Sequence, residues 1–420
     1  MTLHIVTFNV PWPADYGGVI DVYYRIVALA KAGVKIHLHC YTYGREEAKE
    51  LEQWCEEVCY YPREVGLRHQ LERRPYIVAS RCSEALLQRL RQDDHPILLE
   101  GLHCCLLLEQ LRNTQTIRQS DNQAINRRII VRTHNVEHDY YRSLAQSEKS
   151  LWRRLFFIGE ARKLQRYEPI LLKADTVLAI SSSDADHFRS LGCADVRLLP
   201  PSHGHTEVLS YTGRGDYILY HGNLSVPENI RAAHYLLEEI VERCPYQFVI
   251  AGRDPDPYLQ QAVSKHPNVR LVANPDDTAM HQLLQQAHVN LLITHQPTGV
   301  KLKLMNALYE GRYCLVNSTM IQGTALGEAC ILADTPDELL QALALLMVKD
   351  FSEEERQCRI HILEKADPMQ DITSYIQGDF YKSLFEMLFE QKFYKINVQN
   401  YLKILFSICS ISRRRRLKKG

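Results

Sequence analysis

Short continuous apolar runs alternate with helical patterns along the chain, and the alternation is clearest in the second half. There the runs YILYH (217–221), FVIAG (248–252) and VNLLI (289–293) are predominantly apolar. Such runs are typical of parallel strands covered by helices on both faces. The stretch PENIRAAHYLLEEIVERC (227–244) carries its apolar residues at helical spacing. We therefore predict a doubly wound α/β domain over residues 216–348.

The first half repeats this pattern. A helical pattern lies between Val19 and Lys31, among the strand-like runs LHIVTF (3–8), PILLEG (96–101) and RRIIVRTHN (127–135). We predict a second Rossmann-like domain over residues 1–205. The segment 200–216 is rich in Pro, Gly, Ser and Thr, which is typical of a connection between domains. The predicted fold class is α/β, with two doubly wound Rossmann-like domains facing a cleft.

Residues 349–420 are predicted to form C-terminal helices and a basic tail. Apolar residues recur at every fourth position at Ile372, Ile376, Phe380, Leu384 and Leu388, as in an amphipathic helix. The last eight residues, RRRRLKKG, carry six positive charges and follow a short apolar run. This combination favours contact with an anionic membrane surface. The alternative is a solvated basic end.

Composition excludes some classes of partner and location. The chain has 50 basic and 50 acidic residues, so overall charge gives no support for a nucleic-acid partner. Twelve cysteines are scattered, several inside apolar runs, as reduced core thiols are. The sequence begins with a strand-like run and has no apolar stretch near the ~18 to 20 residues of a membrane span. We expect a cytoplasmic protein, peripheral at the inner face of the membrane through its tail.

Two residue pairs resemble metal ligands but lack partners in the sequence. Cys55 and Cys59 are followed by no second pair at zinc spacing. His37 and His39 share one face of a strand, with no third ligand apparent. We expect no metal site, and we expect these two histidines to pack against a helix. His203 and His205, in the connecting segment, are expected to be exposed.

The stretch GVKLKLMNALYEGR (299–312) reads as a glycine loop that enters a helix past two lysines. Free N–H groups and the helix dipole favour an anion at such a helix start. Because Lys301 and Lys303 are two residues apart, they cannot both face one phosphate, and we expect Lys301 to do so. A solvated basic turn is an equal alternative on this stretch alone.

The stretch from 299 to 317 resembles the donor-binding helix and following strand of the GT-B-fold retaining glycosyltransferases of the group 1 type. Other segments resemble further parts of that family in the same order: PWPADYGGVIDVYYRIVALAKAGVKIHLHC (11–40), VRTHNVEHDYYR (131–142), YHGNLSVPENIRAA (220–233) and VIAGR (249–253). The resemblance covers most of residues 1–348. It implies a nucleotide sugar as co-substrate, no metal or other cofactor, and transfer with retention of configuration.

The resemblance also implies where the donor binds. The expected donor-binding residues are Gly222, Asn223, Arg253, Thr298, Gly299, Val300, Lys301 and Asn306. The family carries two glutamates eight positions apart, and Thr298 and Asn306 stand at the corresponding positions. Asparagine can still hydrogen-bond a ribose hydroxyl, whereas threonine is shorter and neutral. Glu310 lies one helical turn further and is not taken as the missing glutamate. Arg253 can instead be an exposed helix-start residue beside Asp254.

The acceptor side is expected in the N-terminal domain. His134 follows a continuous strand, which places it at the strand's carboxyl end, and the resemblance gives it a place near the reacting sugar. We predict His134 and Asp15 as catalytic, and Gly17, Gly18 and Glu100 as acceptor-binding. A tight turn at the two glycines, with Asp15 as helix cap, is the alternative that needs no ligand.

These features lead to one functional hypothesis and two rivals. The hypothesis is a retaining hexosyltransferase that moves sugar from a nucleotide sugar to a glycan or lipid-linked acceptor, in cell-surface polysaccharide or glycoconjugate synthesis. A catalytically inactive, glycosyltransferase-like binding or scaffold protein is one rival, because both family glutamates are replaced. A nucleotide-sugar epimerase is the other, although the acidic and histidine residues it needs are not obvious.

Overall fold

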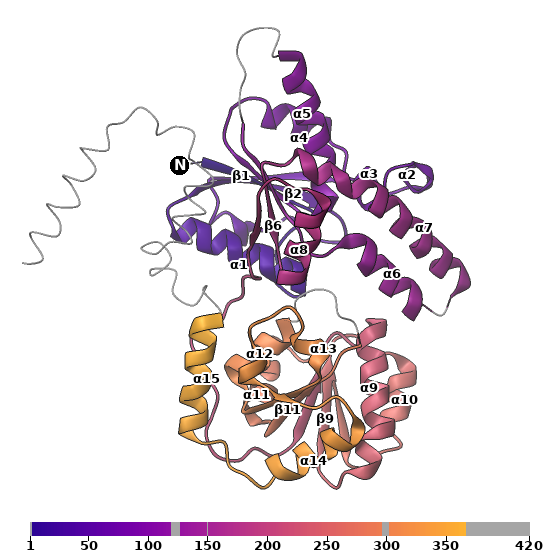
Figure 1. Ribbon diagram of the computed structural model, residues 1–420, viewed down its shortest axis with the longest axis vertical. Helices are drawn as coiled ribbons and strands as arrows, with labels where there is room; N and C mark the ends of the chain where they lie inside the picture. The colour runs from indigo at the N-terminus through magenta and orange to yellow at the C-terminus, as the bar shows by residue number, and fades with distance from the viewer. Residues whose placement is uncertain (1, 119–126, 149, 296–301, 367–420) are drawn as a thin grey trace, which may run out of the picture. The chain divides into compact units, whose positions relative to one another are not determined.

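The computed structural model describes residues 2–118, 127–148, 150–295 and 302–366 (Figure 1). Its strands form two separate parallel sheets, one in each half of the chain. The two-sheet α/β architecture expected from the alternation of apolar runs and helical patterns is therefore confirmed. The expected amphipathic helix beyond residue 370 and the basic tail lie outside the described residues.

The first sheet has seven strands in the order β3-β2-β1-β4-β5-β6-β7. Every neighbouring pair is parallel. The strands are β1 (Thr2–Thr7), β2 (Lys35–Thr42), β3 (Glu57–Pro62), β4 (Ile97–Glu100), β5 (Ile129–Arg132), β6 (Thr176–Ala179) and β7 (Val196–Leu198). The chain builds outward from β1 to β3 and then returns to the other side of β1. The carboxyl ends of β1 and β4 therefore flank a topological switch point, where open α/β sheets bind ligands.

The second sheet has six parallel strands in the order β10-β9-β8-β11-β12-β13. They are β8 (Ile218–His221), β9 (Phe248–Gly252), β10 (Val269–Ala273), β11 (Val289–Leu292), β12 (Tyr313–Val316) and β13 (Ile331–Leu332). Here the strand order reverses between β8 and β11. The carboxyl ends of these two strands are the corresponding ligand-binding position.

Helices connect the strands in both halves. The first half contains α1 (Gly17–Lys31), α2 (Leu67–Leu71), α3 (Tyr76–Ala79), α4 (Glu84–Leu90), α5 (Leu106–Arg118), α6 (Glu137–Ser147), α7 (Leu151–Tyr167) and α8 (Ser182–Leu191). The second contains α9 (Pro227–Glu239), α10 (Pro257–Val263), α11 (Asp277–Gln286), α12 (Leu302–Glu310), α13 (Ser318–Ile321), α14 (Pro336–Leu346) and α15 (Glu353–Ala366). Short 3₁₀ turns include η2 (Leu102–Cys104) and η4 (Glu168–Lys173). Among the described residues, none of the helices has the length and apolar character that crossing a membrane requires.

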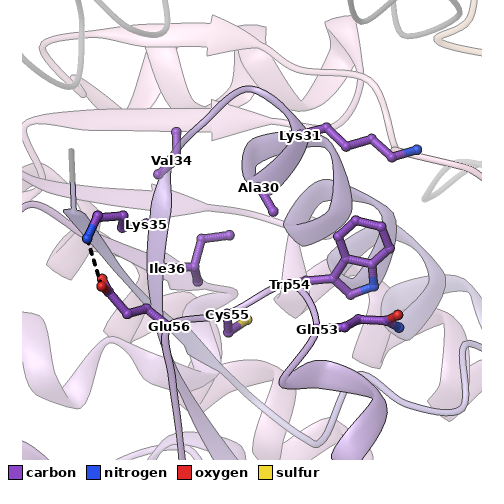
Figure 2. A pocket seen from close by; sticks show the side chains of 9 residues that line it. All are labelled: Ala30, Lys31, Val34, Lys35, Ile36, Gln53, Trp54, Cys55 and Glu56. Atoms are coloured by element: carbon purple, nitrogen blue, oxygen red, sulfur yellow. Dashed lines mark hydrogen bonds and ion pairs between the residues drawn. The ribbon is translucent and has the colours of Figure 1, made fainter.

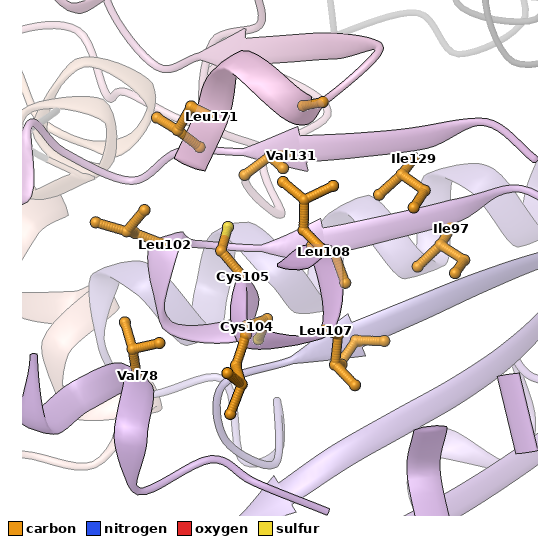
Figure 3. Close-up of a cluster of buried hydrophobic side chains, with 14 of the residues drawn as sticks. Val78, Ile97, Leu102, Cys104, Cys105, Leu107, Leu108, Ile129, Val131 and Leu171 are labelled. Atoms are coloured by element: carbon orange, nitrogen blue, oxygen red, sulfur yellow. The ribbon is translucent and has the colours of Figure 1, made fainter. Parts of the chain in front are cut away.

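Apolar side chains between sheet and helices form the cores. Figure 3 shows part of the first core, where Ile97 of β4 and Ile129 of β5 lie beside Leu107 and Leu108 of α5. Cys104 belongs to this cluster, and burial raises the pKa of its thiol to about 12. The eleven cysteines within the described ranges are free, as the sequence indicates. Tight packing here fixes the positions at which β4 and β5 end.

Candidate active site

A buried group of charged side chains lies at the carboxyl ends of β4 and β5. Glu100 is the last residue of β4, Arg132 is the last residue of β5, and His134 follows β5. Helix α1 contributes Asp21 and Arg25. None of the five is more than 8 % exposed. Burying so many ionisable groups is costly unless they neutralise and bond one another.

Arg25 joins the two carboxylates of this group. Its Nη2 lies 2.6 Å from Asp21 Oδ2, and its Nε donates to Glu100 Oε1 at 2.9 Å. Arg132 Nη2 donates to Asp21 Oδ2 at 3.1 Å. The backbone N–H of Ser202 donates to Asp21 Oδ1 at 2.7 Å. The charges of two arginines and two carboxylates thus balance. The hydrogen bond from Ser202 also holds the segment after β7 against α1.

The pKa values follow from this balance. Burial alone raises the pKa of Asp21, but Arg25 and Arg132 outweigh it and lower that pKa to about 2. Burial also opposes ionisation of Glu100, yet Arg25 and His134 leave its pKa below the usual value. Burial lowers the pKa of Arg132 to about 10, against the pull of Asp21. Both carboxylates are therefore ionised at neutral pH.

His134 is held by the carboxylates on both sides of its ring. Its Nε2 lies 3.0 Å from Glu100 Oε2, and its Nδ1 lies 3.7 Å from Asp21 Oδ2. An ionised carboxylate only accepts hydrogen bonds, so the imidazole donates to Glu100. The ring of Phe8 packs edge-on at 5.3 Å. This arrangement fixes the ring at the strand end and supplies an electrostatic environment for a positive charge developing nearby.

Gly18 and Gly101 give the backbone room around His134. A Cβ atom on Gly18 would lie 3.2 Å from Phe8 Cζ. Gly101 has φ +82°, and a Cβ there would lie 2.7 Å from Nδ1 of His103 and 3.4 Å from Cδ2 of His134. A side chain at either position therefore disturbs the packing around the imidazole. Gly17 is the first residue of α1.

Asp15 is engaged by two arginines. Its carboxylate pairs with Arg45. Its Oδ2 also lies 2.9 Å from Arg253 Nη1. Tyr16, not Asp15, is the N-cap residue of α1, and its side chain makes no capping bond. Two guanidinium groups thus fix the position of this carboxylate, which favours a positioning role for Asp15. Its catalytic role stays a prediction.

Two pockets open at opposite ends of the first sheet. One of about 470 Å³ lies beside the loops that follow β1 and β2 and is lined by Trp12, Asp15, Arg45, Glu46 and Glu47, among others. The other, of about 370 Å³, lies where α1 leads into β2 (Figure 2). The first pocket is at the carboxyl ends of the strands and so on the side of the switch point. An aromatic ring and several carboxylates suit it to hydroxyl-rich ligands.

In the second half, α12 approaches the carboxyl end of β8. Lys303 Nζ donates to Asn229 Oδ1 at 3.0 Å and lies 5.3 Å from the ring centroid of Tyr220. Asn229 Nδ2 donates to the carbonyl of Asn223 at 2.9 Å. A Cβ on Gly222 would lie 3.2 Å from the Asn229 amide. The structure thus brings the expected donor residues Gly222 and Asn223 together with Lys303.

His221 is an additional polar residue at this strand end. It is the last residue of β8, is 5 % exposed, and its Nε2 has no hydrogen-bond partner among the described residues. Burial, with a smaller contribution from Lys303, lowers the pKa of His221 to about 3. The ring is therefore neutral at physiological pH. A buried, unpaired ring nitrogen at a switch point is the kind of group that a ligand satisfies.

Asn306 is bonded within the protein. Its Oδ1 lies 2.9 Å from His205 Nε2, and the His205 ring stacks on Tyr309 with centroids 4.9 Å apart. The His205 side chain is 14 % exposed, so the expectation of an exposed residue is wrong. The connecting segment folds back on α12, which a composition rich in Pro and Gly does not reveal. Thr298, Gly299, Val300 and Lys301 lie outside the described residues.

The second half of the chain matches a known protein family. Residues 215–349 match the family described as glycosyl transferases group 1. This stretch holds the second sheet, the β8 strand end and α12. The protein carries a group 1 glycosyltransferase domain.

Similar proteins extend over both halves of the chain. Over 359 residues it is 25 % identical to an uncharacterized 44.6 kDa protein in the cps region of Klebsiella pneumoniae, covering 80 % of this chain and 88 % of that one. Three crystal structures share its fold: Anabaena HepE in complex with UDP and glucose (TM-score 0.55, 13 % identity), a glycosyltransferase from Rickettsia africae (0.58, 9 %) and the pneumococcal O-GlcNAc transferase GtfA in complex with UDP and GlcNAc (0.56, 12 %). Each covers 92 or 93 % of this chain and at least 99 % of the other. The GT-B fold expected from the sequence is confirmed.

Two histidine clusters in the first half of the chain were not predicted from the sequence. His4 Nδ1 bonds to His39 Nε2 at 2.8 Å, and potential ligand atoms of His4, His37 and Asp93 converge. The expectation that no third potential ligand accompanies the histidine pair is therefore wrong, because the register of β1 on β2 places His4 beside His37. His37 does contact a helix as expected, since Arg89 Nη2 of α4 lies 3.1 Å from its Nδ1. Arg89 and Arg127 also contact Asp93. Their charges oppose a metal cation there.

The second cluster links three segments of the first half. Glu168 of η4 accepts hydrogen bonds from His138 of α6 at 3.2 Å and from His187 of α8 at 2.8 Å. Both bonds brace helices against one another. Sequence reasoning missed this cluster, together with Asp21, Arg25 and His221, and it favoured Lys301 over Lys303. His221 could have been predicted as a site residue, because it is a polar residue at the end of an apolar strand. Asp21 and Arg25 could not, because charged residues are common in an amphipathic helix such as α1.

Proposed function

We propose that the protein transfers a sugar from a nucleotide-sugar donor to a glycan or lipid-linked acceptor. The observation that carries this proposal is the meeting of Lys303, Asn229 and Gly222 at the β8 strand end inside the group 1 domain. A role in cell-surface polysaccharide synthesis is supported by the Klebsiella relative in a cps region. A uridine nucleotide as donor is supported by HepE and GtfA, whose structures contain UDP.

The donor would place its diphosphate near Lys303. Departure of a nucleoside diphosphate leaves negative charge on the phosphate oxygens, and a fixed cation stabilises that charge. His221, neutral and unpaired at Nε2, can accept or donate one hydrogen bond to the donor. Gly222 lets a ligand approach the backbone closely. These contacts require no metal ion, and metal-independent transfer is part of the proposal.

The acceptor would bind to the first half of the chain. It would lie between the pocket lined by Trp12 and Asp15 and the buried charged group that contains His134. In this proposal His134 faces the reacting sugar, and Glu100 sets the ring's orientation. Asp15, Gly17 and Gly18 would shape the acceptor side. We further propose that the sugar is a hexose and that its configuration is retained. The carboxylates beside His134 would stabilise the positive charge of an oxocarbenium-like sugar. Such a transfer does not require a strong protein nucleophile.

A binding protein without transferase activity is the second candidate. It is favoured by Asn306, which stands where the family has a glutamate and is bonded to His205. This bond uses one acceptor position of the Asn306 amide and fixes its orientation, so any contact with a ribose must come from the remaining oxygen lone pair or the Nδ2 hydrogens. Such a contact is weaker than the charged one that a glutamate offers.

Two measurements on the purified full-length chain separate these candidates. Thermal shift with UDP, GDP and their sugars identifies the nucleotide, because a ligand at 100 times its dissociation constant adds about 2.7 kcal/mol to stability. Release of nucleoside diphosphate in the presence of glycan or lipid-linked acceptors then reports transfer. Binding and release that are both reduced in Lys303→Ala support the enzyme. Binding without release for every acceptor supports the second candidate, and the absence of any nucleotide binding contradicts both.

We also propose a peripheral location at the cytoplasmic face of the membrane, to which the basic tail contributes. Each cation near an anionic surface is worth on the order of 1 kcal/mol before screening. Salt should weaken this contribution.

A further inference from the structure

The first two turns of α7 present large apolar side chains to solvent. Leu151 is 66 % exposed, Trp152 82 %, Leu155 52 % and Phe156 38 %. Leu151 and Leu155 are four residues apart, as are Trp152 and Phe156, so the four side chains share one side of the helix. Single exposed apolar residues are ordinary, but four that adjoin one another form a patch that needs a partner.

From Phe157 onward, the other side of α7 is covered by the protein. Ala161 and Leu164 are buried, and the ring of Phe157 packs edge-on against Tyr141 of α6 at 5.9 Å. Figure 1 shows α6 and α7 running side by side. The helix therefore already has its packing partner, and the four exposed residues are not needed for it. We call Leu151, Trp152, Leu155 and Phe156 the α7 patch.

Basic residues surround the α7 patch. Arg153 and Arg154 lie within the same two turns and are exposed. Further along the helix the basic residues are Arg162, Lys163 and Arg166. The one acidic residue of α7, Glu160, is 2 % exposed and accepts a hydrogen bond from the Tyr76 N–H at 2.6 Å. The exposed charge of this helix is therefore positive.

Helix α2 repeats this combination beside α7. Leu67 is 75 % and Leu71 86 % exposed, and Arg68 lies between them. Lys163 Nζ of α7 donates to the carbonyl of Gln70 at 2.7 Å. This bond fastens α2 to the helix that bears the patch, so both segments belong to one region of the first half.

We propose that the α7 patch, with α2, is a docking surface for an anionic lipid bilayer. Leucine and phenylalanine gain by entering the apolar part of the interface, while the indole of Trp152 has an apolar body and one polar N–H and suits the headgroup level. Arginines beside it attract anionic headgroups. The inference rests on exposure and charge, and it holds whether or not the protein transfers sugar.

A second copy of the chain is the competing occupant. In a two-fold contact through the same patch, Arg153 and Arg154 of one copy would approach their own counterparts, because each surface meets itself. Like charges brought together in this way oppose association. An anionic bilayer instead neutralises them, so charge complementarity selects the lipid.

The test is vesicle flotation of the full-length protein with phosphatidylglycerol-containing and purely phosphatidylcholine vesicles. The four tail arginines, Arg413 to Arg416, are replaced by glutamine in every variant so that the tail contributes little. We expect Trp152→Ala/Leu155→Ser to weaken binding to the anionic vesicles about tenfold or more. Arg153→Gln/Arg154→Gln should weaken it less and reduce its salt dependence. Leu345→Ser, at a site 71 % exposed on α14, is the matched control and should leave binding unchanged.

Tryptophan fluorescence gives a second readout that requires no loss of binding. Brominated lipids should quench the protein, and Trp152→Phe should remove most of that quenching while the vesicles still bind. Equal vesicle binding by the Trp152→Ala/Leu155→Ser and control variants overturns the proposal. So does quenching that persists in Trp152→Phe. A dimer in solution that Trp152→Ala/Leu155→Ser dissociates, without any change in vesicle binding, would assign the patch to a second copy.

Discussion

Glu100 and His134, which are 34 positions apart in the sequence, are joined by a 3.0 Å hydrogen bond at the ends of two adjacent strands. The same carboxylate accepts from Arg25 at 2.9 Å. Glu100 therefore orients the imidazole and also neutralises a buried guanidinium. Losing its charge should affect both turnover and folding.

Replacing Glu100 by glutamine should destabilise the protein by about 3 kcal/mol, because removing one charge of a buried pair leaves the other uncompensated. Urea unfolding measures this loss. Turnover should fall as well, since an amide can present its N–H to the ring and release it from its orientation. Lys35→Gln, which breaks the exposed pair with Glu56, is the control and should cost less than about 1 kcal/mol. Equal losses in the two variants would show that the network is not charge-sensitive.

Replacing His134 by alanine should reduce turnover while donor binding is largely kept, because the residue belongs to the first half and the donor is expected in the second. Nucleotide binding is measured by titration, and turnover by diphosphate release. Thermal unfolding monitors the loss of the contact with Phe8. If turnover is unchanged, the imidazole has only a packing role.

The two lysines at the start of α12 give opposite expectations from sequence and structure. Position relative to the helix start favours Lys301. The contacts of Lys303 with Asn229 and Tyr220 lead us to expect that Lys303→Ala weakens nucleotide binding about tenfold or more, as losing a charge-assisted contact does. Lys301→Ala should have a smaller effect. Titration of both variants with the same nucleoside diphosphate decides between them, and a larger effect at Lys301 restores the expectation from the sequence.

Stability should fall as the pH is lowered below about 6.5, because buried histidines must stay neutral in the folded protein. Burial lowers the pKa of His4 to about 4, against the pull of Asp93, and lowers that of His39 to about 3. The unfolded chain binds protons at these residues from about pH 6.5 downward, and the folded chain does not. Each histidine therefore removes up to about 1.4 kcal/mol of stability per pH unit between about pH 6 and its folded pKa.

The pH dependence is tested by urea unfolding between pH 5 and pH 7.5 in the wild type and His39→Gln. Burial raises the pKa of Glu137 to about 8, so this residue makes the folded protein more stable as the pH falls. The test therefore compares the slope of the free energy of unfolding against pH in the two proteins, since Glu137 contributes equally to both. The variant should have the smaller slope. Parallel stability curves for the two proteins would show that His39 does not contribute.

The alternation of parallel strands and helices along the chain was predictable from the sequence alone. Continuous apolar runs such as 248–252 and 289–293 require cover on both faces, and the helical spacing between them supplies it. The same local patterns place His134 and Glu100 at strand ends, because both follow or complete an apolar run. Local periodicity is sufficient for these conclusions, since it depends only on residues near one another in the chain.

Only the tertiary structure decided which side chains meet. His4 pairs with His39 because β1 lies parallel to β2 in one register. Asp21 and Arg25 reach Glu100, Arg132 and His134 because α1 lies against the ends of β4 and β5. His205 reaches Asn306 because the connecting segment folds back on α12. Strand order and register are set by how all the elements bury their apolar faces together, so no short stretch of sequence contains them.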